Sequence, residues 1–312
     1  MTLRARSLSF SFSRVPVIAE LSFSVTPGLV HAVLGPNGAG KSTLLRLLLG
    51  DLVPTGGEVT LELPAPSSRT EDNAPHPERP APISAPAHVH RLAESQRAMM
   101  LAYVPQNPSV AFGYTLAEYL SMGLLARRVS PREPVRQALL RLGLDGARSF
   151  DELSAGQQQR AALARAMLQL SAPMAPISGA PNSPDMASSI GAAFVDSHQS
   201  QNAPARFILA DEPLSAMDPH HQLESISLLR SIAASGIGVV IVLHDVLVAR
   251  AIADRVLILG RDGRLACEGP VHDTLTPAAL ERVFGVAFVE VGSNASALVP
   301  RDLTRTPKPP IP

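Results

Sequence analysis

The chain has 312 residues, of which 46% are hydrophobic and 17% are charged, so it is long enough to enclose a substantial core. Its 27 basic and 27 acidic residues cancel, which disfavours nucleic acid as the main partner because proteins of that class usually carry a basic surplus. A single cysteine, Cys267, excludes a disulfide framework and fits a reducing compartment. The chain has no apolar run long enough to span a bilayer and no signal-peptide pattern at its N-terminus. We therefore expect a soluble protein that reaches a membrane only through a partner.

The N-terminal third contains a phosphate-binding pattern. Residues 3–34 alternate apolar and polar side chains, which predicts two or three strands. The apolar strand Val30 to Leu34 leads into Gly35-Pro36-Asn37-Gly38-Ala39-Gly40-Lys41-Ser42-Thr43, and a leucine-rich helix then runs to Gly50. The glycines allow the backbone to wrap a phosphate chain, and the helix adds its positive end. Lys41 should reach the β- and γ-phosphates, and the Ser42 hydroxyl should bind Mg²⁺. The alternative is a glycine-rich turn with a surface lysine.

Two stretches interrupt the pattern of strands and helices. After a strand at residues 58–63, the segment 64–95 begins with a run rich in Pro, Ala and Ser, and residues 171–205 have a similar composition. Such segments carry too few large apolar side chains to fold alone, so we predict two flexible insertions. The first contains His76, His88 and His90; we interpret them as polar filler, with a metal or haem contact as the alternative.

The rest of the chain alternates strands and helices. Strands are predicted at Met100–Val104, Arg206–Ala210, Val239–Leu243 and Arg255–Leu259, and helices from Thr115, over Pro131–Leu142, from just after Ser154 to Leu170, and over Pro219–Ala234, Val246–Ala253 and Pro277–Phe284. This β/α order predicts a mainly parallel sheet with helices on its faces. The tail from Arg301 to Pro312 is predicted to be disordered.

Polar residues follow several of these strands, at the edge where parallel sheets place their ligands. They are Gln106, Asp211, Glu212 and His244. Asp211 is expected to be a second Mg²⁺ anchor. Glu212 would polarise a water molecule for attack on the γ-phosphate, His244 would contact that phosphate, and Gln106 would bridge metal and water. Taken singly, each has a structural alternative: a loop or helix start for Asp211-Glu212-Pro213, and a satisfied structural histidine for His244.

Together these motifs resemble the ATP-binding subunit of ABC transporters, over nearly the whole chain apart from the insertions and the tail. Gly35 to Thr43 match the Walker A loop, Gln106 matches the Q-loop, and Leu153-Ser154-Ala155-Gly156-Gln157 match the signature L-S-G-G-Q. Phe207 to Glu212 match the Walker B strand, Ser215-Ala216-Met217-Asp218 match the D-loop, and His244 matches the switch histidine. Phe12 lies where the family has an aromatic residue that stacks on adenine. Six motifs in the right order make chance similarity negligible. Ala155 departs from a glycine and Phe12 from the commoner tyrosine. Neither predicts inactivity, because a backbone N–H at 155 and an aromatic ring at 12 are retained.

The resemblance implies an α/β P-loop NTPase fold with a mainly parallel core sheet, N-terminal antiparallel strands and a helical subdomain, all in one domain spanning 1–312. The core would comprise 1–63, 96–106 and 206–265, the helical subdomain 107–170, and the C-terminal helix and tail 266–312. It also implies ATP and Mg²⁺ as ligands, catalytic roles for Glu212, His244 and Gln106, and metal contacts from Ser42, Gln106 and Asp211.

The resemblance further implies a head-to-tail homodimer. Ser154, Ala155, Gly156 and Gln157 of one copy would meet the γ-phosphate held by the other copy's Walker A loop, with Asp218 at the interface. The dimer would lie on the cytoplasmic face of a bacterial inner membrane, bound to two copies of a transmembrane permease.

The cargo is expected from a narrower similarity. Residues 104–115, VPQNPSVAFGYT, are similar to the region of haem-import ATPases that commonly reads V-L-P-Q-x-x-S-V-A-F-P-F-T, as are the stretch before Walker B and the run 273–286. This similarity implies import of hemin from a periplasmic haem-binding protein, with an iron–siderophore or cobalamin importer as the runner-up. A soluble ABC ATPase of DNA repair or translation is the alternative from another class. Tandem cassettes, coiled-coil insertions or basic arms are usual there, whereas this chain has one cassette and no charge surplus. The signature and His244 exclude a generic P-loop kinase or GTPase.

Overall fold

The computed structural model describes residues 2–62, 86–127, 129–170, 205–215, 217–291 and 297–301. Its centre is a six-stranded sheet in the order β10-β9-β3-β8-β7-β6. These strands are β3 (Val30–Leu34), β6 (Leu101–Val104), β7 (Phe207–Asp211), β8 (Gly238–Val242), β9 (Arg255–Leu259) and β10 (Leu265–Pro270). All neighbours are parallel except β9 and β10. Every residue of β3, β7 and β8 is buried, as expected for parallel strands covered on both faces.

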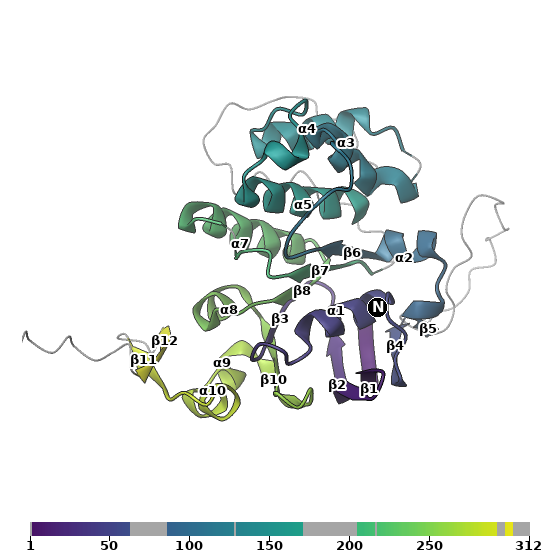
Figure 1. The fold of residues 1–312 in the computed structure, drawn as a ribbon. Coiled ribbons are helices and arrows are strands. Elements are labelled where there is room, and N and C mark those ends of the chain that lie inside the picture. The colour runs from purple at the N-terminus through teal and green to yellow at the C-terminus, as the bar shows by residue number, and fades with distance from the viewer. Residues whose placement is uncertain are drawn as a thin grey trace, which may run out of the picture.

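A second, antiparallel sheet stands beside the core sheet (Figure 1). It contains β1 (Thr2–Phe12), β2 (Val15–Val25), β4 (Gly56–Glu62) and β5 (Ala87–His88), in the order β2-β1-β4-β5. Helix α1 (Lys41–Leu49) buries its leucines in a core shared by both sheets, against Phe23 of β2, Val33 of β3 and Leu209 of β7. The packing of both sheets on one helix fixes the position of the loop that precedes it.

A helical group lies on the far side of β6 and β7 (Figure 1). It contains α3 (Leu116–Ser121), the 3₁₀ turn η2 (Met122–Arg127), α4 (Arg132–Leu142), η3 (Phe150–Glu152) and α5 (Ala155–Leu170). Thr115 caps α3 as predicted: its Oγ1 accepts from Glu118 N at 3.3 Å, and the Glu118 carboxylate accepts from Thr115 N at 2.8 Å. The buried ring of Phe150 packs 4.1 Å from that of Tyr119, centroid to centroid. This stacking holds α3 against the residues that precede α5.

The C-terminal part completes the layers. It comprises α7 (Pro219–Ala234), α8 (Val246–Ile252), α9 (Val271–Thr274), α10 (Pro277–Phe284) and a hairpin of β11 (Phe288–Val291) and β12 (Ala297–Pro300). The predicted ranges of α7, β9 and α10 are confirmed. In the described part of the chain, no helix is both long and apolar enough to cross a membrane.

The structure differs from the sequence prediction most clearly in residues 86–95 and in the hairpin β11–β12. Residues 86–95, expected to be part of a flexible insertion, form β5, η1 (Val89–Arg91) and the start of α2 (Glu94–Met100). Val89 is fully buried at the end of α1, and Arg97 donates to Gly50 O at 2.8 Å. One buried valine and pairing with β4 therefore order this segment. The hairpin β11–β12 was not predicted at all.

Two of the three histidines in the first insertion, His88 and His90, lie in the described ranges. His88 and His90 lie on β5 and η1 with ring centroids 5.7 Å apart, and His88 Nδ1 is 3.4 Å from a Glu58 oxygen. No group of three histidine, cysteine or carboxylate side chains suited to a metal occurs in the described ranges. His76, the rest of 64–85 and residues 171–204 lie outside those ranges.

Candidate nucleotide site

The loop between β3 and α1 passes so close to its neighbours at two positions that a side chain is excluded there. Gly35 and Gly40 have φ of 151° and 89°. A Cβ atom on Gly35 would lie 2.7 Å from Leu259 O, and one on Gly40 would lie 2.8 Å from Ile18 Cδ1 and 2.9 Å from Val17 O. Only glycine fits both the conformation and the space. The loop is thus fixed between the end of β9 and strand β2.

Lys41 folds back over this loop. Its Nζ donates to Gly35 O at 2.9 Å and to Pro36 O at 3.1 Å. Burial lowers the pKa of Lys41, and the carboxylates of Glu212 and Asp211 oppose that shift. The ammonium group is therefore held at the loop by backbone carbonyls, which phosphate oxygens can replace.

Ser42 and Asp211 meet where α1 begins and β7 ends. The Ser42 hydroxyl lies beside the Asp211 carboxylate and favours its charged form. Burial raises the pKa of Asp211, while the hydrogen bond from Ser42 and the charge of Lys41 act in the opposite direction. Asp211 Oδ1 is buried, and nothing in the described part of the chain hydrogen-bonds to it. A hydroxyl beside a carboxylate with one unused oxygen is a donor set that suits Mg²⁺.

Glu212 stands between two polar side chains from the neighbouring strands. Gln106, after β6, donates from Nε2 to Glu212 Oε2 at 2.7 Å, and His244 Nε2, after β8, contacts Glu212 Oε1. Because β6, β7 and β8 are adjacent and parallel, their carboxyl ends deliver these residues to one edge of the sheet. Glu212 also has φ of 45°, a left-handed conformation that costs on the order of 1–3 kcal/mol in a non-glycine residue and is concentrated at functional sites.

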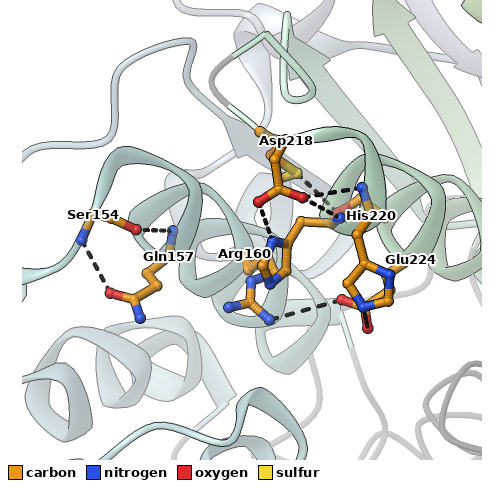
Figure 2. A network of polar contacts seen from close by, with 9 residues as sticks. Ser154, Gln157, Arg160, Asp218, His220 and Glu224 are labelled. Carbon is orange, nitrogen blue, oxygen red and sulfur yellow. Dashed lines mark hydrogen bonds and ion pairs between the residues drawn. The ribbon is translucent and has the colours of Figure 1, made fainter.

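The predicted signature residues form the start of α5. Ser154 N donates to Gln157 Oε1 at 3.0 Å, and Gln157 N donates to Ser154 Oγ at 3.3 Å (Figure 2). Ala155 and Gly156 form the first turn of this helix. In Figure 1, α5 and α1 lie on opposite sides of β6 and β7, so the sheet separates the signature helix from the helix that follows the phosphate loop.

Asp218 caps helix α7. Its Oδ1 accepts from His220 N at 3.0 Å and His221 N at 3.1 Å, and His221 Nδ1 lies 2.6 Å from Oδ2. The hydrogen bond from His221 lowers the pKa of Asp218 to about 2. An Arg160–Glu224 ion pair of 3.9 Å joins α7 to α5 near this point (Figure 2). The start of α7 is thus tied to the signature helix.

Phe12 ends β1, with its ring edge-on to Phe10 at a centroid distance of 4.8 Å. The residue is 49% exposed, which leaves ring surface available for stacking on a base. The same β1–β2 ribbon supplies the Val17 and Ile18 atoms that contact Gly40. Phe12 therefore lies on the same β1–β2 ribbon that approaches the phosphate loop at Gly40.

Sequence reasoning missed Gln159. This residue is 1% exposed, and its Nε2 donates to Pro105 O, one residue before Gln106, at 3.1 Å. The available signal was a polar residue among the buried positions of a helix otherwise filled by Ala, Leu and Met.

Comparison with known proteins agrees with this geometry. The family model described as "ABC transporter" matches residues 18–173. The chain belongs to the ABC transporter family. This ABC protein is 32% identical over 293 residues to the Hemin import ATP-binding protein HmuV of Bordetella pertussis, covering 92% of this chain and 93% of the relative. The protein of the same name from Agrobacterium fabrum is 31% identical, with 92% of each chain covered.

Solved structures support the same assignment. An ABC transporter in an inward-facing conformation has a TM-score of 0.66 at 25% identity and covers 96% of each chain. A dimeric ATP-binding cassette in a post-hydrolysis state, bound to ADP and phosphate, has a TM-score of 0.61 at 21% identity and covers 87% of this chain and 99% of its own. The predicted P-loop NTPase fold and the assignment as an ATP-binding ABC ATPase are confirmed.

Proposed function

We propose that this ABC ATPase drives the import of hemin across a bacterial inner membrane. Two copies would bind two copies of a transmembrane permease at the cytoplasmic face, and a periplasmic haem-binding protein would deliver the cargo. The cargo assignment is supported by the hemin-import names of relatives that are 31–32% identical over 92% of the chain. Its runner-up is an iron–siderophore or cobalamin importer built on the same ATPase.

The observation that carries the catalytic proposal is the position of Glu212 between Gln106 and His244, beside the phosphate loop. A water oxygen would attack the γ-phosphorus while Glu212 accepts the water proton, and the bond to the bridging β–γ oxygen would break. Gln106 and His244 would hold the carboxylate in line. Lys41 would exchange its bonds to Gly35 O and Pro36 O for bonds to phosphate oxygens.

We assign the Mg²⁺ site to the Ser42 hydroxyl and the free Oδ1 of Asp211. When bound, the ion would neutralise charge on the β- and γ-phosphates. Gln106 remains a proposed metal contact through its amide oxygen, because its Nε2 donates to Glu212 and the oxygen is the atom that can bind a cation.

We further propose that the active unit is a head-to-tail homodimer of single-domain subunits, each with a helical subdomain over 107–170. Helix α5 begins directly after Ser154, and β6 and β7 separate it from α1, which follows the phosphate loop (Figure 1). Helix N-termini favour anions, so this end suits the γ-phosphate bound by a partner copy. Asp218 would lie at the same interface, and Phe12 would stack on adenine.

The test of the catalytic assignment is Glu212→Gln, which keeps the size of the side chain and removes its ability to accept a proton. We expect ATP turnover to fall by at least a hundredfold, while ATP stabilises a dimer visible by gel filtration. Glu133→Gln, on the exposed surface of α4, is the matched control and should hydrolyse ATP at the normal rate. Undiminished phosphate release by Glu212→Gln would contradict the assigned role.

The cargo is tested separately in cells that lack this chain and depend on one iron source. Growth on hemin should require the chain and should not be restored by Glu212→Gln. A growth defect restricted to a ferric siderophore, or to cobalamin, would replace hemin by the runner-up.

A further inference from the structure

Helix α5 and the edge strand β6 are joined by a row of side-chain hydrogen bonds. Among the described residues β6 pairs in the core sheet with β7 alone, so its other edge offers carbonyls that no described strand uses. Three α5 side chains donate to that edge: Gln159 Nε2 to Pro105 O at 3.1 Å, Arg165 Nη2 to Tyr103 O at 3.0 Å, and Gln169 Nε2 to Leu101 O at 2.9 Å. The acceptors are alternate residues, which is the spacing at which carbonyls face the same way along a strand.

The two elements match in length over these contacts. From Gln159 to Gln169 the helix rises about 15 Å, and from Leu101 to Pro105 the strand rises about 13 Å. Helix and strand run in opposite directions, so the first donor meets the last acceptor. The contacts therefore hold α5 and β6 in register, with Gln159 at the end nearest the nucleotide site.

The Gln159 contact lies between the two halves of the proposed site. The Pro105 carbonyl belongs to the same planar peptide unit as the Gln106 nitrogen, and Gln106 donates to Glu212 at 2.7 Å. In the other direction, Ser154 lies only five residues before Gln159 at the start of the helix. The Gln159–Pro105 hydrogen bond thus connects the Ser154 end of α5 with the Gln106–Glu212 pair.

Packing alone does not account for a glutamine at position 159. The residue is 1% exposed, and its Oε1 is buried with no partner in the described ranges. An unpaired buried acceptor is unfavourable, and a methionine or leucine would fill the same space without one. The donor of Gln159, and not its packing, is what distinguishes it from those residues.

We propose that Gln159 is a positioning residue that fixes the Pro105–Gln106 peptide and so directs Gln106 toward Glu212. When the Ser154 end of α5 meets the phosphate bound to a partner copy, Gln159 transmits the shift of the helix to Gln106 of its own copy. The Pro105 carbonyl and the Gln106 nitrogen share one planar peptide, so the Gln106 nitrogen moves with the carbonyl that Gln159 holds. This inference rests on the proposed ATPase dimer and adds a residue that links its two phosphate contacts.

The experiment compares Gln159→Met with Gln169→Met in the full chain. Both remove an amide donor to β6 and keep the length of the side chain. Gln159→Met should lower kcat about tenfold, the effect of one hydrogen bond worth about 1.4 kcal/mol, with KM for ATP within about twofold. Gln169→Met loses its contacts with Ala98 O and Leu101 O, so it should lower the melting temperature and leave kcat unchanged.

A second variant covers the case in which Gln159→Met does not fold. In Gln159→Glu, a protonated carboxyl can donate to Pro105 O and a carboxylate cannot. Its kcat should therefore approach the wild-type value at low pH and fall, relative to wild type, as pH rises. Parallel pH profiles, equal kcat losses in the two methionine variants, or no loss in Gln159→Met would overturn the proposal. An inactive Glu212→Gln together with a normal Gln159→Met refutes only the role of Gln159, whereas an active Glu212→Gln refutes the catalytic assignment itself.

Discussion

His31 should make the folded state sensitive to mild acid. It lies within β3 at 7% exposure, and its Nε2 accepts a hydrogen bond from Thr26 N at 3.1 Å. Burial, helped by the neighbouring Arg255 guanidinium, lowers the pKa of His31 to about 4, although the charge of Asp254 acts in the opposite direction. In the unfolded chain the pKa is about 6.5. Between pH 4 and pH 6.5, His31 is therefore mostly protonated in the unfolded state and mostly neutral in the folded state.

The sign and size of the effect follow from this difference. Because the unfolded state binds more protons, the free energy of unfolding decreases as pH falls through 6.5 toward 4. A shift of this size corresponds to about 3 kcal/mol in full, and to about 2 kcal/mol at pH 5. At pH 7.5 the histidine is neutral in both states and contributes almost nothing to the pH dependence.

Urea unfolding of wild type and His31→Gln at pH 7.5 and pH 5.0 measures this contribution. The glutamine keeps a hydrogen-bond acceptor and has no group that titrates in this range. Other ionisable groups act in both proteins, so the loss of stability between the two pH values should be about 2 kcal/mol smaller in the variant. An equal loss in both proteins would refute the assignment of the acid sensitivity to His31.

Two further predictions concern the first insertion and the signature helix. A chain lacking residues 67–84 should hydrolyse ATP within about twofold of the wild-type rate, because that composition does not build a core; a collapse of activity in a phosphate-release assay would show that the segment matters. Ser154→Asp should keep the melting temperature, since aspartate caps helices as well as serine, but it should lose ATPase activity because a carboxylate repels the γ-phosphate. Ser154→Ala, the control, should lose activity and also part of the stability, and a fully active Ser154→Asp would contradict the proposed phosphate contact.

The parts of the fold that were predicted from sequence carry local signals. Helix α7 begins where Asp218 caps it and Pro219 occupies its first turn, and α10 begins in the same way at Thr276 and Pro277. The segment 86–95 has no such signal, because β5 is two residues long and η1 buries a single valine. Its order comes from the edge of β4 and the end of α1, which are formed by residues distant in sequence.

In the candidate site, too, some features could be predicted from the sequence and others could not. Placing Gln106, Glu212 and His244 at strand ends required only the order of strands and the rule that ligands gather at one edge of the sheet. That Gln106 donates to Glu212, and that Glu212 adopts φ of 45°, could not be predicted, because both depend on contacts across about a hundred residues of sequence. The hydrogen bond from Gln159 to Pro105 could not be predicted either, because it joins residues that are far apart in the sequence.

The contacts within one copy also decide which groups the signature helix can offer to a partner. The N–H of Ser154 is used by Gln157 Oε1, and the N–H of Gln157 is used by Ser154 Oγ. The N–H groups of Ala155 and Gly156 open the helix and have no acceptor within it, and the Ser154 hydroxyl accepts in the cap while its own proton stays available. In the proposed dimer, three donors could therefore meet the partner's phosphate without breaking the Ser154–Gln157 contacts, and two of them are backbone groups that the methyl of Ala155 does not replace. Aspartate would cap α5 equally well but would bring a negative charge and no proton to donate, so the proposed interface requires a hydroxyl at position 154.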